Sequence, residues 1–237
     1  MVRSSTLIFS AAVLLIGNFG MVSAASLVVD QGPHDPALQS RNSNTNFNNA
    51  SDQQVADDFT VVGSGLEVNR LELWFTYRDL IVDQLSGVAP AIQNLLVRIF
   101  GEDPNGDPDA LVYEESVSFV PIPTGDENGF LTPNEIYYAS IELLSPFPPE
   151  DGERYWLSPI GSDDNVTWQW QLSGSEGERR SRGGAGGPDW RDTALDNVTP
   201  LTGDFAFRLY AVRSEEHTSE LQSRRNLVCR LLLATKK

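Results

Sequence analysis

The chain has 237 residues, and its 33 acidic and 17 basic side chains give a net charge of −16 at neutral pH. A chain of this length is sufficient for one domain with a sizeable core. Because nucleic-acid binding needs Lys and Arg to neutralise phosphates, so large an acidic excess argues against nucleic acid as a partner.

The first 25 residues have the three parts of a secretory signal peptide. One basic residue in "MVRSS" precedes the apolar run "TLIFSAAVLLIG", and the small residues of "MVSAAS" follow it. The apolar run is short for a bilayer span, which disfavours a membrane anchor. We predict a cleaved signal helix over 1–25, with cleavage after Ala24 or Ala25.

The next segment, 26–50, begins with the strand-like run "SLVVD" and then becomes polar and rich in Asn and Ser. It contains His34, the only histidine before residue 213. The polar part has no periodicity, so we predict an N-terminal arm that precedes the folded domain.

Short strand-like runs follow one another from residue 51 to residue 212, most of them rich in β-branched or aromatic residues. They are 55–62, 66–77, 94–102, 110–120, 135–143, 154–160, 166–173 and 204–212. Several alternate with period two, so that Leu71, Leu73 and Phe75 share one face. We predict an all-β domain over 51–212, an antiparallel, jelly-roll-like β-sandwich of about 8–10 strands.

Two stretches differ from this pattern. The run "DLIVDQLSGVAPAIQ", 79–93, is the one candidate for a short helix. The Gly-rich stretch 174–190 predicts a flexible loop with a cluster of Arg179, Arg180 and Arg182. These arginines could meet solvent, an anionic polysaccharide or the acidic face of the domain itself.

One loop carries hard oxygen ligands at alternate positions, with a glutamate at the spacing of a closing bidentate ligand. These candidate ligands of a structural calcium ion are Asp103, Asn105, Asp107, Asp109 and Glu114. Pro108 stands where an EF-hand loop needs Gly, and the flanking runs are strands. A hairpin loop whose side chains cap their own backbone is therefore the favoured alternative.

The tryptophans late in the chain are candidate carbohydrate-binding residues. Trp168 and Trp170 alternate in phase and share one sheet face, and Trp190 follows the Gly-rich loop. An exposed aromatic pair could stack on sugar rings. The favoured alternative for the pair is the core, because one face of each sheet must be filled by large apolar side chains.

No catalytic set is evident in the sequence before residue 213. This part of the chain has no Cys, no G-x-S-x-G motif and no His spacing typical of a metal site. Paired carboxylates could serve a glycosidase, but the neighbours Asp57 and Asp58 point to opposite faces of a strand. We therefore predict that the protein is not an enzyme.

Residues 213–237 differ in composition from the rest of the chain. They hold the only Cys and both Lys, whereas residues 1–212 carry 11 Arg against 30 acidic residues. Back-translation of "RSEEHTSELQS", 213–223, resembles a widely used sequencing adapter, and "LVCRLLL", 227–233, continues it in frame after a short index. We predict an artefactual tail, disordered or helical, in place of the native C-terminus; the competing interpretation is an amphipathic helix with a reactive Cys.

Four pieces occur in a distinctive order: "SDQQVADDFTV", "VRIFGEDPNGDPDALVYE", "GERYWLSPIG" with "VTWQWQLS", and a Trp followed by "DFAFRLYAV". Over about residues 50–212 the chain resembles bacterial secreted β-sandwich proteins of the PEP-CTERM (exosortase-sorted) type. The resemblance implies export and a role at the cell surface or in the extracellular matrix. The Pro-Glu-Pro motif and apolar helix of such proteins would follow where the adapter-like tail begins.

These observations lead to one main hypothesis and two others. We expect a non-catalytic structural or adhesive module of the bacterial surface or extracellular matrix, whose partners are extracellular polysaccharide or surface proteins. A carbohydrate-binding module is the alternative, and a glycoside-active enzyme ranks third. Contact with a membrane would require the C-terminal anchor that the tail has replaced.

Resequencing the 3′ end of the gene from intact genomic DNA tests the adapter hypothesis. We expect the codons after residue 212 to encode a Pro-Glu-Pro motif, an apolar helix and a basic cluster. A genomic sequence that encodes residues 213–237 as printed would contradict this prediction.

Overall fold

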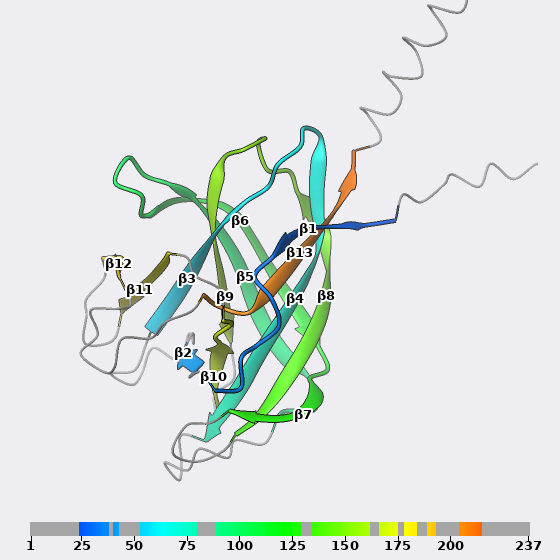
Figure 1. Ribbon diagram of the computed structural model, residues 1–237, viewed down its shortest axis with the longest axis vertical. Coiled ribbons are helices and arrows are strands. Elements are labelled where there is room, and N and C mark those ends of the chain that lie inside the picture. The colour runs from blue at the N-terminus through cyan, green and yellow to red at the C-terminus, as the bar shows by residue number, and fades with distance from the viewer. Residues whose placement is uncertain are drawn as a thin grey trace, which may run out of the picture.

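The computed structural model describes residues 24–37, 40–42, 53–79, 89–128, 134–161, 166–174, 178–183, 189–192 and 204–214. All the regular structure in these residues is β-structure, arranged as two antiparallel sheets packed together (Figure 1). The predicted β-sandwich is confirmed, whereas the jelly-roll order of its connections stays a prediction. Residues 1–23, most of the helix candidate and residues 215–237 lie outside the described residues.

The first sheet has seven strands: β1 (Ser26–Asp30), β2 (Ser40–Asn42), β4 (Leu66–Asp79), β7 (Ile122–Asn128), β8 (Asn134–Phe147), β10 (Val166–Gln171) and β13 (Phe207–Arg213). Its order is β1-β13-β4-β10-β2, with β8 paired to β4 and β7 paired to β8. The second sheet has six strands: β3 (Gln53–Thr60), β5 (Gln93–Glu102), β6 (Pro108–Phe119), β9 (Arg154–Gly161), β11 (Arg179–Gly183) and β12 (Arg191–Asp192). Its order is β12-β11-β3-β9-β5-β6.

The long strand β4 organises the first sheet. One of its edges pairs first with β13 and then with β10, while β8 pairs along the other edge. As predicted, the period-two alternation of β4 places Leu71, Leu73 and Phe75 in the core, and all three are completely buried. They belong to one apolar cluster with Val97 and Ile99 of β5, so the core lies between the two sheets.

The tryptophans of β10 fill this core, and the carbohydrate-binding interpretation of Trp168 and Trp170 is wrong. Both side chains are 0% exposed. The Trp170 ring stacks on Phe205 with centroids 4.5 Å apart, and its indole Nε1 donates to the Ala206 carbonyl at 3.1 Å. The pair faces the second sheet, so no sugar ring can stack on it.

The domain is larger than the predicted 51–212. Strand β1, which coincides with the strand-like run "SLVVD", pairs with β13, and β2 pairs with β10, so residues 26–30 and 40–42 of the predicted arm belong to the first sheet. At the other end β13 extends to Arg213, and the Ser214 amide donates to the Gly65 carbonyl at 2.9 Å. The three polar residues of β2 carry no apolar pattern, and the strand is defined by its backbone pairing with β10.

A carboxylate joins the edge strand β6 of the second sheet to β8 of the first. Glu115 accepts hydrogen bonds from the backbone amides of Leu144 at 2.8 Å and Ser145 at 3.1 Å, and from the Tyr113 hydroxyl at 2.5 Å. Although partial burial raises the pKa of Glu115, these hydrogen bonds outweigh it and lower the pKa below its ordinary value. The ionised carboxylate therefore fastens one corner of the sandwich.

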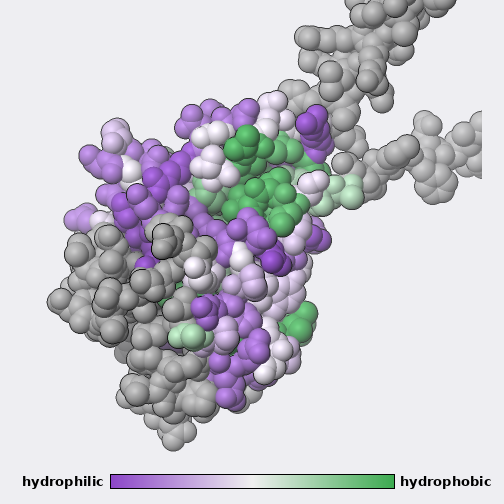
Figure 2. Space-filling view, in the orientation of Figure 1, coloured by the Kyte–Doolittle hydropathy of each residue, from purple (hydrophilic) through white to green (hydrophobic). Residues whose placement is uncertain are grey.

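The surface of the described residues is mainly polar in the view of Figure 2, with one apolar patch beside β1 and β13. Some large apolar side chains are exposed, such as Val62 and Leu144. No helix among the described residues is both long enough and apolar enough to cross a bilayer.

The close contact between Gly161 and Trp168 yields a test of the core. A Cβ atom added at Gly161 would stand 2.3 Å from the Trp168 Cβ, whereas one added at Gly101 would meet no atom closer than 3.8 Å. We expect Gly161→Ala to lower the free energy of unfolding by about 1–3 kcal/mol or more through overpacking, as measured by urea denaturation. Gly101→Ala is the matched control, and equal losses in the two variants would contradict the packing.

Candidate functional site

A second, smaller apolar cluster lies on the outer face of the six-stranded sheet. It consists of Ala56, Phe100 and Trp156, with Trp190 packed against it. In the strand register Trp156 of β9 stands between Asp58 of β3 and Phe100 of β5. Trp156 is completely buried although it faces away from the main core, so other side chains must cover it.

Three arginines cover this cluster. The guanidinium groups of Arg154 and Arg180 lie 4.9 and 5.2 Å from the centre of the Trp156 ring. That of Arg182 lies 4.5 Å from Trp190 and 5.5 Å from Phe100. These distances are within the range of cation–π attraction. We call the three arginines together with the aromatic side chains of Phe100, Trp156 and Trp190 the arginine–aromatic cluster.

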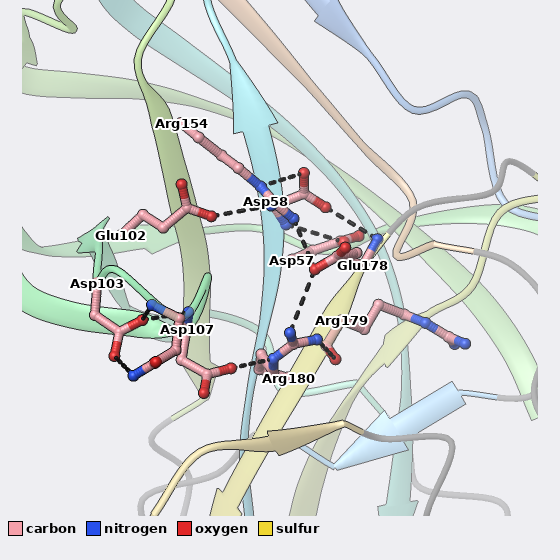
Figure 3. Close-up of polar contacts among 10 residues, drawn as sticks. Asp57, Asp58, Glu102, Asp103, Asp107, Arg154, Glu178, Arg179 and Arg180 are labelled. Atoms are coloured by element: carbon pink, nitrogen blue, oxygen red, sulfur yellow. Dashed lines mark hydrogen bonds and ion pairs between the residues drawn. The ribbon is translucent and has the colours of Figure 1, made fainter.

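Arg154 is held by three carboxylates from different parts of the sheet (Figure 3). Its guanidinium nitrogens lie 2.9 Å from Asp58, 2.9 Å from Glu102 and 3.0 Å from Glu178. Burial lowers the pKa of Arg154, but these carboxylates outweigh burial and raise it. Arg154 therefore ties β3, the end of β5 and the segment before β11 to β9.

Arg180 forms the second centre of the network. Its Nε donates to Asp107, and one terminal nitrogen lies 3.3 Å from Glu178. Arg179, the neighbouring residue, is directed away from Arg180 in Figure 3 and is buried. The predicted flexible loop is therefore a strand at this point, and Arg179 and Arg180 meet the acidic residues of the domain itself.

The candidate calcium ligands do not converge on one point. Asp103 Oδ1 accepts from the Asn105 and Asp107 amides, both at 2.8 Å, and its Oδ2 accepts from the Asn105 side chain at 2.9 Å. These hydrogen bonds, led by that from Asp107, lower the pKa of Asp103. Asp109 is exposed.

The predicted closing ligand, Glu114, lies in the middle of β6 and pairs with Arg98 at 2.7 Å. The turn interpretation of the loop therefore fits the structure better than the calcium interpretation. The described residues contain no group of three or more His, Cys, Asp or Glu side chains that could hold a metal ion.

A buried carboxylate, Asp57, lies on the inner side of β3. Asp57 is 0% exposed and accepts hydrogen bonds from the amides of Phe205 at 2.6 Å and Asp58 at 3.1 Å. Burial raises the pKa of Asp57 well above its ordinary value, and the nearby Asp204 carboxylate adds to this effect. As the strand period predicts, Asp57 and Asp58 serve opposite faces.

Comparison with known proteins gives one match. A family model described as a domain of unknown function, DUF7901, matches residues 29–209. The chain belongs to the DUF7901 family. Neither the search of curated proteins nor that of solved structures found a match. The family match begins at Val29 within β1 and ends at Leu209 within β13, so it includes residues of the segment before residue 51.

Sequence reasoning identified part of the arginine–aromatic cluster of this DUF7901 domain and missed its centre. Trp190, Arg180 and Arg182 were candidates, whereas Trp156 and Arg154 were assigned only to a strand. The signal was present in "ERYWL", where Arg154 and Trp156 stand two residues apart and so share a face. Their acidic partners lie up to 96 residues away in sequence, which no local pattern reveals.

The role of Arg154 can be tested by substitution. Arg154→Gln leaves Asp58, Glu102 and Glu178 without their shared cation, so we expect a loss of about 1–2 kcal/mol in the free energy of unfolding. Arg98→Gln, which breaks a single pair with Glu114, is the matched control with an expected loss below about 1 kcal/mol. Chemical denaturation at low salt measures both, and equal losses would contradict the network.

Proposed function

We propose that this DUF7901 protein is a non-catalytic, exported structural or adhesive module of the bacterial surface or extracellular matrix. The observation that carries the proposal is the ion-pair network that fixes the outer face of the second sheet. Arg154 and Arg180 join four segments there without any cysteine in the described residues. A fixed and charged face suits a protein that presents a surface to partners outside the cell.

The state of the carboxylates favours this proposal over an enzyme. A glycosidase needs an accessible acid with a raised pKa and a second carboxylate across the scissile bond. Asp57 has the raised pKa but is completely buried, and Asp58 is engaged by Arg154. The carboxylates of the network are thus used in holding strands together.

Export and anchoring are part of the same proposal. They are supported by the signal-like residues 1–25 and by the resemblance to PEP-CTERM proteins over about residues 50–212. In this proposal the native gene product is held at the surface by a C-terminal segment that the adapter-like tail has replaced.

A carbohydrate-binding role is the second candidate function, and one observation favours it. With Trp168 and Trp170 in the core, Trp190 is the remaining candidate of the three, and it is only partly buried. It lies beside Arg182 on the outer face, where a ligand could reach it.

Cell fractionation tests the proposed location. We expect the full chain, expressed in a Gram-negative host with an exosortase system and with its native 3′ end restored, in the surface or matrix fraction. A variant without residues 1–25 is the control and should stay in the cytoplasm. Full-length protein found only in the cytoplasm would contradict the proposal.

A further inference from the structure

Arg182 differs from the other arginines of the outer face because no carboxylate among the described residues neutralises it. Arg154, Arg180 and Arg98 each pair with at least one carboxylate. The hydrogen bond of Arg182 goes instead to the neutral amide oxygen Oε1 of Gln54, at 2.8 Å. In a protein with a net charge of −16, an arginine without an acidic partner is unexpected.

The position of Arg182 makes its charge costly. The side chain is half-buried, and burial lowers the pKa of its guanidinium, with a further contribution from the nearby charge of Arg98. An anion bound to Arg182 would offset both the cost of burying its charge and the repulsion from Arg98. In the free protein, therefore, Arg182 carries a charge that a bound anion would stabilise.

An aromatic side chain adjoins this charge. The Trp190 ring lies 4.5 Å from the Arg182 guanidinium and packs edge-on against Phe100, with ring centroids 5.6 Å apart. Trp190 remains partly exposed, whereas Trp156 of the same cluster is fully buried. Tryptophan offers a wide apolar surface with a polar edge, which suits the ring of a sugar.

We infer that Arg182 and Trp190 form a subsite for an acidic sugar, a uronate unit of an extracellular polysaccharide. The sugar carboxylate binds the planar guanidinium of Arg182, and the sugar ring lies against Trp190. This inference rests on the proposed role outside the cell and names its ligand.

The surroundings favour a uronate over other anions. The guanidinium fork matches a planar carboxylate, with which it forms two parallel hydrogen bonds. The net charge of −16 would repel a phosphate dianion more strongly than a single negative charge. A peptide carboxylate would carry the charge but no ring to cover Trp190.

Calorimetric titration of the full chain with trigalacturonate tests the inference. We expect binding that weakens at high salt and that falls about tenfold or more with the methyl ester of the same trisaccharide. The ester keeps the sugar rings and removes the charge. Triglutamate and inorganic phosphate are the other probes, and each should bind about tenfold more weakly or worse.

Variants locate the site. We expect Arg182→Gln to reduce the affinity for trigalacturonate at least tenfold, and Trp190→Leu to reduce it severalfold. Arg70→Gln is the matched control, because Arg70 lies over the Tyr210 ring at 3.7 Å on the other sheet. Its affinity should equal that of the unaltered protein. Should Arg182→Gln fail to fold, Trp190→Phe and the ester comparison on the unaltered chain decide.

Three outcomes would overturn the inference. They are no binding of trigalacturonate, equal binding of its methyl ester or of triglutamate, and a loss in Arg70→Gln that matches the loss in Arg182→Gln. Each is distinct from a failure of the proposed function, since a protein found at the cell surface that binds no uronate contradicts this inference alone.

Discussion

The ion pairs of the Arg154 guanidinium are the interaction on which the outer face of the second sheet depends. This guanidinium pairs with Asp58, Glu102 and Glu178, which belong to separate segments, and it lies over the Trp156 ring. Removing this one cation would leave the three carboxylates close together without their shared partner, and Arg180 would remain over the Trp156 ring. In a domain without cysteine pairs, such a cation does in part what a covalent crosslink does elsewhere, although its strength depends on salt and pH.

Consecutive aspartates in β3 connect this outer network to the interior. The Asp57 side chain points inward and accepts from the Phe205 amide, on the segment that leads into β13. The Asp58 side chain points outward and accepts from the Glu178 amide at 3.0 Å and from Arg154. Asp57 thus supplies an acceptor to the buried amide of Phe205, whereas Asp58 supplies one to the exposed amide of Glu178. The dipeptide Asp57-Asp58 therefore binds the backbone of Phe205 on the inner face of β3 and that of Glu178 on its outer face.

Patterns within single strands predicted much of the fold, whereas long-range pairing escaped them. The alternation around Leu71 predicted its burial correctly, because the strand period depends on local backbone geometry. The sequence predicts a loop at β11, the strand of Arg180, because its Gly and charged residues give no sign of a strand held by pairing with β3. For Trp168 and Trp170 the sequence allows two interpretations, an exposed sugar-stacking pair and a core pair. Only the tertiary structure separates a core position from one at the surface.

The charge distribution explains why the outer face remains open at one place. The network supplies carboxylates to Arg154 and Arg180, and these two arginines lie over Trp156, which is completely buried. At the β11–β12 side the same face has an arginine and a partly exposed tryptophan, yet the partner of Arg182 is the neutral Gln54. Replacing Gln54 by Glu would give Arg182 a carboxylate partner, as Arg154 and Arg180 already have. We expect the new carboxylate of Gln54→Glu to form an ion pair with Arg182 and so to compete with a uronate for the same guanidinium. Uronate binding should therefore weaken, while the melting temperature stays that of the unaltered protein.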